Sequence, residues 1–166
     1  RSLTGSYAGA MGWGQFIPSS FRAYAVDFDD DGERDIWANA EDAVGSIANY
    51  FAEHGWRPGG PVLRRVVATE PEAVAGIVNR GLELQSSVGE LRRLGVTGLD
   101  VLGGDEAAGL WRVEGAAGEE LYATFGNFFT ITRYNRSHLY GLAVHDLARE
   151  IAVGLAIPEG EIADGP

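Results

Sequence analysis

A segment near the start of the chain, residues 5–20, combines flat apolar side chains and neutral hydrogen-bonding groups on a glycine-rich backbone. Glycines leave the backbone bare, so a ligand or another chain can approach it closely. A sugar ring offers a C–H face for stacking and hydroxyls for hydrogen bonding, so this composition favours a sugar over a phosphate. The alternative interpretation is a packing segment whose small residues let helices touch. The side chains in question are Ser6, Tyr7, Trp13, Gln15 and Phe16.

A second group that could do chemistry is the acidic loop of residues 27–35. Asp27, Asp29 and Asp31 occupy positions 1, 3 and 5 of an EF-hand-like loop, with Gly32 at the turning position 6. Alternate side chains of a tight loop converge on one point, where a hard divalent cation takes carboxylate oxygens at about 2.3–2.6 Å. Glu33 at position 7 would contribute its backbone carbonyl. The spacing therefore predicts a cation site, with Ca2+ as the expected ion.

This loop departs from the EF-hand pattern at position 12, where Ala38 replaces the usual bidentate glutamate. The closing carboxylate must come from further along, either from Glu41 or from Asp42. The alternative is a solvated acidic turn or a helix cap that holds no cation. We expect a structural role for the cation, which could fix the loop between two helices.

Helices on both sides must position these groups. Pro18 suits the first turn of a short helix. Asn39 is a candidate cap for a helix over about 40–54, with apolar residues at helical spacing and Gly55 as its stop. Residues 135–155 predict a last long helix with Tyr140, Val144, Leu147 and Ile151 along one face.

The middle of the chain has a different pattern, in which short strand and helix signals alternate, and this pattern predicts a small inserted α+β lobe over residues 61–125. Strands are expected at 62–69, 110–113 and 120–125, the last two around a turn at 115–118. Two capping boxes, at 69–72 and 87–90, predict helices, the first of them running to about residue 79. Residues 127–134 are aromatic and β-branched, which predicts an extended return to the core.

Composition limits the classes of function. The 166 residues carry a formal net charge of -11, 45% hydrophobic residues and no cysteine. Nucleic-acid binders usually carry a basic face, so no nucleic-acid partner is expected. Attraction to anionic lipid is also disfavoured, and no apolar run approaches the roughly 20 residues that a membrane span needs. The chain opens at Arg1 without Met, which we interpret as a mature or trimmed fragment.

Several motifs, taken in their order and spacing over residues 1 to about 155, resemble the lytic murein transglycosylase B family, glycoside hydrolase family 103. They are the run at 6–12, the run at 15–20, Tyr24 to Asp27, the acidic loop, Ala48 to Tyr50, and then Tyr134, Asn135, Ser137 and Tyr140. The resemblance implies an α+β, mainly α fold, with a lysozyme-like helical core and the inserted lobe. Core helices are expected at 1–60, the lobe at 61–125, a return segment and core helix at 126–156, and a tail at 157–166.

The resemblance implies cleavage of the β-1,4 bond between N-acetylmuramic acid (MurNAc) and N-acetylglucosamine (GlcNAc), with formation of a 1,6-anhydro ring. A single carboxyl group would serve first as acid and then as base, which requires a raised pKa. In the family that glutamate precedes the motif at residues 6–12, so the resemblance names no catalytic residue in this chain. We expect the chain alone to be inactive.

The same resemblance assigns a substrate-binding half to the chain. The implied sugar contacts are Ser6, Gln15, Phe16, Tyr50, Tyr134, Asn135 and Tyr140. The implied metal ligands are Asp27, Asp29, Asp31, Glu33 and, as the favoured closing carboxylate, Asp42. The alternative is a purely structural role for some of these residues: Phe16, Tyr50 and Tyr140 would be core residues, and Asn135 would cap the last helix.

The expected partner is the glycan strand of peptidoglycan, and the expected state is a monomer in the bacterial cell envelope, periplasmic or associated with the outer membrane. Two other classes of function stay open at this point. One is a non-catalytic, calcium-stabilised peptidoglycan-binding module, and the other is a calcium-dependent structural domain with no glycan role.

Overall fold

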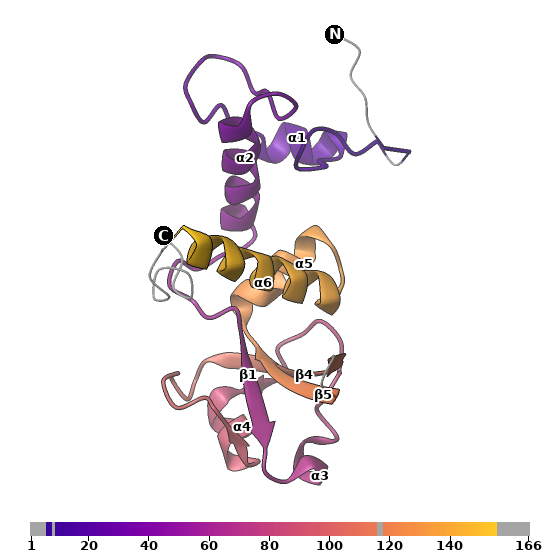
Figure 1. The fold of residues 1–166 in the computed structure, drawn as a ribbon, viewed down its shortest axis with the longest axis vertical. Helices are drawn as coiled ribbons and strands as arrows, with labels where there is room; N and C mark the ends of the chain where they lie inside the picture. The colour runs from indigo at the N-terminus through magenta and orange to yellow at the C-terminus, as the bar shows by residue number, and fades with distance from the viewer. Residues whose placement is uncertain (1–5, 8, 116–117, 156–166) are drawn as a thin grey trace. The chain divides into compact units, whose positions relative to one another are not determined.

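The computed structural model describes residues 6, 7, 9–115 and 118–155 of an α+β protein (Figure 1). The predicted tail at 157–166, Ala8 and the centre of the predicted turn at 116–117 lie outside the described residues. The chain divides into two compact units, Arg1–His54 and Gly55–Pro166. The α+β class is confirmed, whereas the finer division into a core and an inserted lobe stays a prediction.

The first unit contains two helices, α1 (Pro18–Tyr24) and α2 (Ala40–Glu53). The predicted cap of α2 is confirmed, because the Asn39 side chain accepts hydrogen bonds from the amides of Glu41 and Asp42. Side chains of α2 also hold the chain that follows α1. Asn49 Nδ2 donates to the carbonyl of Tyr24 at 3.0 Å, and Ser46 Oγ accepts from the amide of Val26 at 3.0 Å.

The second unit is built on a five-stranded antiparallel sheet in the order β2-β4-β5-β1-β3. Its long strands are β1 (Leu63–Ala68), β4 (Ala107–Gly115) and β5 (Gly118–Thr124), which overlap the three predicted strand regions. The short strands β2 (Ser86–Ser87) and β3 (Val96–Thr97) form its edges. Its helices are α3 (Pro71–Val74), α4 (Val88–Arg93), α5 (Gly126–Tyr134) and α6 (His138–Gly154) (Figure 1).

The core of this unit forms where the sheet meets α3 and α4. Burial of these apolar side chains is the main term that stabilises it, at roughly 25 cal/mol per Å² removed from water. The largest fully buried members are Val74, Val88, Leu91, Leu99 and Phe125.

The two predicted capping boxes have different outcomes. At α4 the box is present in full, since Ser87 Oγ accepts from the amide of Glu90 and the Glu90 carboxylate accepts from the amide of Ser87. At residues 69–72 the prediction is wrong, because Glu70 is the cap residue and makes no side-chain cap bond. Thr69 Oγ1 instead donates to the carbonyl of Gly95, and α3 ends at Val74, well short of residue 79.

The prediction of an extended segment at 127–134 is also wrong, because α5 occupies these residues. Phe128, Ile131 and Thr132 are buried at the spacing of a helix face, and this burial overrides the preference of aromatic and β-branched residues for strands. Gly141 of α6 lies directly against the Phe128 ring, where an added Cβ would come within 2.7 Å of Cε2. The packing of α6 on α5 therefore fixes the helical state.

The last helix, α6, forms close to the predicted range, but its details differ. Its cap is Ser137, whose hydroxyl accepts from the amide of Tyr140, so Asn135 is not the cap residue. The predicted apolar face is only partly buried: Tyr140 and Val144 are half-buried, whereas Leu147 and Ile151 are more than half exposed. Among the described residues, no helix is long and apolar enough to span a bilayer.

A buried side-chain amide organises the irregular start of this unit. Asn127 is 1% exposed, and its Oδ1 accepts from the amide of Arg57 at 2.8 Å. Its Nδ2 donates to the carbonyls of Arg57 and Gly60, both at 2.8 Å. One amide group thus satisfies three backbone groups in a segment that has no regular secondary structure.

We expect Asn127→Ala to lower the free energy of unfolding by about 2–4 kcal/mol, because it removes three hydrogen bonds and takes the side-chain partner from the Arg57 amide and the Gly60 carbonyl. Urea denaturation followed by far-UV circular dichroism measures this loss. Asn135→Ala is the matched control, because Asn135 is exposed, and we expect a change within about 0.5 kcal/mol. Equal effects of the two substitutions would contradict the structural role of Asn127.

Candidate cation site and sugar-binding residues

The acidic loop is organised around Asp42, a fully buried carboxylate in the first turn of α2. Its Oδ1 accepts from the amide of Phe28 at 2.7 Å, and its Oδ2 accepts from the amide of Asp35 at 2.7 Å. Asp42 therefore joins the two ends of the loop to the helix. Hydrogen bonds from backbone amides, together with a place near the positive end of the helix, stabilise its charge.

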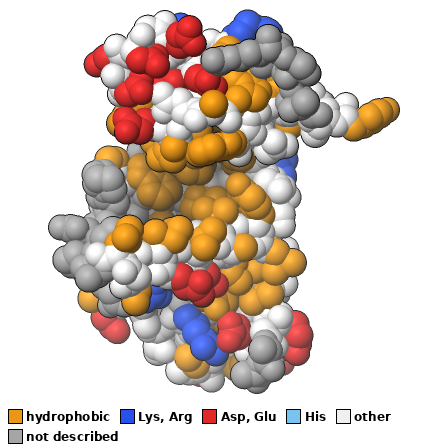
Figure 2. Space-filling model, turned by 45° about the horizontal axis from the view of Figure 1, so that its top comes forward, with side chains coloured by type: hydrophobic (Ala, Val, Ile, Leu, Met, Phe, Trp, Pro, Cys, Tyr) orange, Lys and Arg blue, Asp and Glu red, His pale blue; other side chains and the backbone are white. Residues whose placement is uncertain are grey.

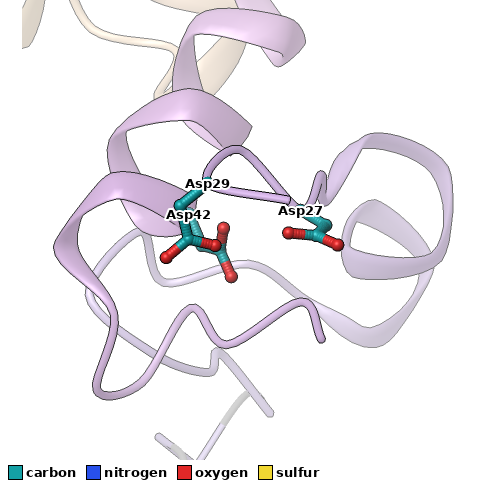
Figure 3. Close-up of side chains that lie close together, drawn as sticks. All are labelled: Asp27, Asp29 and Asp42. Atoms are coloured by element: carbon teal, nitrogen blue, oxygen red, sulfur yellow. The ribbon is translucent and has the colours of Figure 1, made fainter. Parts of the chain in front are cut away.

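Asp27 and Asp29 complete a group of three carboxylates. Each of Asp27, Asp29 and Asp42 offers an oxygen within 4.8 Å of the other two. Figure 3 shows the three carboxyl groups gathered around a common region beside the start of α2. Asp27 also accepts from the amides of Asp31 and Gly32, and Asp29 accepts from Asn39 Nδ2 at 2.8 Å. Acidic side chains crowd the surface here (red, top of Figure 2).

The remaining predicted ligands are placed differently. The Asp31 carboxylate lies outside the close group found among the described residues, and its Oδ1 accepts from the amide of Glu33 at 2.8 Å. Gly32 has φ +92°, as the predicted turn requires. Of the two candidates for the closing carboxylate, Asp42 belongs to the close group and Glu41 does not. Three converging hard oxygen donors fit Ca2+, with the Glu33 carbonyl as a predicted addition.

The glycine-rich segment forms a tight hairpin-like turn. Met11 and Phe16 pair through both backbone bonds, at 2.9 and 3.0 Å, and the amide of Trp13 donates to the carbonyl of Ile36 at 2.9 Å. Gly12 has φ +64°, and a Cβ on it would come within 2.5 Å of that same Ile36 carbonyl oxygen. This position therefore requires glycine, because any side chain would force the turn away from the end of the acidic loop.

The polar residues of this segment are exposed and held in place. Gln15 has φ +51°, a left-handed conformation that is uncommon for a residue other than glycine, and its Nε2 donates to the carbonyl of Gly12 at 2.9 Å. Ser6 Oγ accepts from the amide of Ala10 at 3.1 Å. The exposed indole of Trp13 adds a flat apolar face. The turn thus presents an amide, a hydroxyl and an aromatic ring.

Phe16 and Tyr50 belong to one aromatic cluster in the first unit. Phe16 is 3% exposed, and its ring centroid lies 6.1 Å from that of Tyr50. Tyr50 is half-buried, stacks on His54 at 3.9 Å and meets the edge of Tyr24 at 5.0 Å. Phe16 therefore supports Tyr50 from the core, and the rings of Tyr24 and His54 fix its orientation. Tyr24 and His54 were missed as site residues, although the i, i+4 spacing of Tyr50 and His54 could have indicated a pair.

The other predicted sugar contacts belong to residues 55–166. Tyr134, the last residue of α5, and Tyr140, in the first turn of α6, are half-buried, and Asn135 between the two helices is exposed. Burial raises the pKa of Tyr140, so its phenol is a neutral hydrogen-bonding group at neutral pH. The roles of these three residues as sugar contacts, like those of Gln15 and Tyr50, stay predictions.

Comparison with known proteins assigns the chain to the lytic transglycosylase class. Residues 1–149 match the family model described as Transglycosylase SLT domain, and the chain is a member of that family. It is 41% identical over 152 residues to the membrane-bound lytic murein transglycosylase B of Escherichia coli (strain K12). The aligned residues cover 92% of this chain and 40% of that protein.

Solved structures agree with this assignment. Soluble lytic transglycosylase SltB1 from Pseudomonas aeruginosa is 48% identical, with a TM-score of 0.87 over 93% of this chain and 51% of that one. Escherichia coli Slt35 in complex with calcium is 41% identical, with a TM-score of 0.78 over 93% and 47% of the two chains. SltB3 from P. aeruginosa, solved with NAG-anhNAM-pentapeptide, is 40% identical, with a TM-score of 0.71 over 86% and 38%. The chain thus spans about half the length of these relatives or less.

We expect Ca2+ to raise the melting temperature of this protein, because a ligand that binds only the folded state at 100 times its Kd stabilises that state by about 2.7 kcal/mol. For a chain of 166 residues the rise should be roughly 5–10 °C. Differential scanning calorimetry with Ca2+ and with a chelator measures it.

Asp29→Asn should abolish most of this calcium-dependent rise, since it removes one of the three converging carboxylates. Asp30→Asn is the matched control, because Asp30 is exposed, lies outside the group and has φ +60°, a conformation that asparagine tolerates. A rise that survives Asp29→Asn but disappears in Asp30→Asn would place the cation elsewhere.

Proposed function

We propose that this chain carries the substrate-binding part of a lytic transglycosylase that cleaves the MurNAc-β-1,4-GlcNAc bond of peptidoglycan and leaves a 1,6-anhydro-MurNAc end. The family membership over residues 1–149 carries the proposal. We assign the parent protein to the bacterial cell envelope and its helical part to a lysozyme-like core. We assign no catalytic residue within this chain.

The surface of the first unit has the chemistry that a glycan needs. Gln15 and Ser6 present neutral donors and acceptors, and Trp13 presents a flat apolar face. The turn that carries them is fixed by the Met11–Phe16 pairing and by Gly12 against Ile36, so little conformational entropy is lost when a sugar binds. In the proposal Tyr50 faces the bound sugars, and Phe16 holds Tyr50 from beneath.

Tyr134, Asn135 and Tyr140, in the second unit, are a second group of proposed sugar contacts. Tyr140 is a neutral phenol with a raised pKa, and Asn135 offers an exposed amide. An amide can donate to and accept from the acetamido groups that both sugars of the strand carry. These three residues lie within seven positions of one another around the start of α6.

Calcium, when bound at Asp27, Asp29 and Asp42, would supply positive charge that neutralises three converging carboxylates. The effect reaches the sugar-binding turn through residues 35 and 36. Asp42 holds the amide of Asp35, and the next residue, Ile36, accepts from the amide of Trp13. The cation site therefore braces the turn that carries Gln15, which gives calcium a structural role in the proposed function.

We expect Gln15→Ala to weaken binding of chitotetraose or of stem-free murein glycan by roughly 2- to 12-fold, the value of one hydrogen bond. Isothermal titration calorimetry measures the Kd. Gln85→Ala is the matched control, because Gln85 is also exposed and also donates from Nε2 to a nearby carbonyl, that of Arg80. If neither substitution changes the Kd, or if no glycan binds, Gln15 has no part in a sugar site.

The activity is tested on a protein that contains this domain together with the rest of its parent chain. Intact sacculi should yield 1,6-anhydro-MurNAc ends, identified by mass spectrometry of the released fragments. Reducing muramic ends would indicate hydrolysis. Glycan binding without any cleavage would instead identify a calcium-stabilised peptidoglycan-binding module.

A further inference from the structure

An open groove of about 610 Å³ is lined only by residues of the second unit, and none of them is among the predicted cation or sugar ligands. Its polar groups belong to Arg57, Asp105 and Glu106, and Leu84 supplies an apolar wall. The remaining lining residues are three glycines and an alanine. A Cβ added at Gly103 or Gly104 would meet no protein atom within 4 Å. The groove is thus wide and open to a flexible ligand, with a few charged groups beside a mostly apolar lining.

Its charged groups are paired but still accessible. Arg57 Nη2 donates to Glu106 Oε1 in an ion pair, with the Arg57 side chain 54% exposed and that of Glu106 20% exposed. A guanidinium has five N–H donors, so one bond to Glu106 leaves others for a ligand carboxylate. Asp105 is exposed beside the pair. One positive and two negative groups favour a ligand that carries both signs over an anion alone.

The backbone that carries these groups is preorganised. Asn127 holds both the amide and the carbonyl of Arg57. On the other wall, the carbonyls of Gly104 and Glu106 accept from the amides of Gly89 and Val88 at 2.8 and 2.9 Å, which fixes the 103–107 loop to the start of α4. A half-exposed arginine with a clamped backbone loses less entropy on binding than a freely mobile one.

We propose that this groove binds the zwitterionic end of a peptide stem, the ammonium and carboxylate of a single amino-acid centre. The carboxylate binds the free N–H groups of Arg57, the ammonium binds Asp105 and Glu106, and the methylene chain lies along Leu84 and the glycines. In murein such a centre is the free end of the diamino acid in an uncrosslinked stem. The inference rests on the proposed function, which brings stem-bearing strands to this protein, and it adds recognition of the stem.

The probe is the free tripeptide L-Ala-γ-D-Glu-meso-diaminopimelate, which contains no sugar. We expect amide shifts in a 1H–15N NMR titration at Leu84, at 103–107 and at Gly126. Acetylation of the side-chain amine, or amidation of the carboxylate on the same centre, should each weaken binding about tenfold, because each removes one charged contact. These comparisons use the unmodified protein and do not depend on how a variant folds.

Arg57→Gln and Glu106→Gln should each weaken tripeptide binding about tenfold. The matched controls are Arg64→Gln and Glu114→Gln, which remove the same charges from exposed sites on β1 and β4 and should leave the Kd unchanged. Equal affinity for the free and acetylated tripeptides, shifts confined to other residues, or no binding would overturn the proposal.

Titration with chitotetraose separates this proposal from the glycan site. Normal glycan binding with no tripeptide binding would overturn stem recognition alone. Tripeptide binding at the groove without glycan binding would support the groove and count against the sugar-binding turn.

Discussion

The two units depend on the same constraint: backbone that lies outside helices and strands must still find hydrogen-bond partners. In each unit one buried polar side chain supplies several of them. Asp42 is fully buried and accepts hydrogen bonds from the amides of Phe28 and Asp35. Asn127 is 1% exposed and bonds to the amide and the carbonyl of Arg57 and to the carbonyl of Gly60. Both side chains come from helices, so a regular element fixes an irregular one. The segments proposed to bind a cation and a peptide stem are the segments fixed in this way.

The constraint also explains the chemistry of the acidic loop. A buried carboxylate is costly unless it accepts hydrogen bonds, and Asp42 accepts two from the loop that it anchors. That arrangement brings Asp27 and Asp29 close to a third negative charge, which is unfavourable without a counter-charge. The loop geometry and the proposed cation site therefore both follow from the same bonds.

The sequence predicted features that depend on local chemistry. The Asn39 cap, the capping box at Ser87 and the EF-hand-like spacing all lie within a few residues, so their patterns are readable. Prediction from the sequence failed where contacts between residues far apart in the chain determine the secondary structure. The residue types of α5 favour a strand, but the segment is helical because Phe128 is buried against Gly141. The groove at Arg57 was missed for a related reason, since Arg57 and Glu106 are 49 residues apart and form no motif.

The link between the predicted cation site and the turn of residues 11–16 could not be predicted from the sequence either, although the sequence indicated each of the two parts. Asp42 fixes the amide of Asp35, and the carbonyl of Ile36 accepts from Trp13 and leaves room only for a glycine at position 12. The left-handed backbone of Gln15 belongs to the same short turn, and such a conformation persists only when its surroundings determine it. Because Asp35 and Ile36 connect Asp42 to this turn, the proposed function implies that loss of the cation would loosen the backbone that holds Gln15. Calcium would then act on the proposed sugar binding through two consecutive residues, without contact between the ion and the glycan.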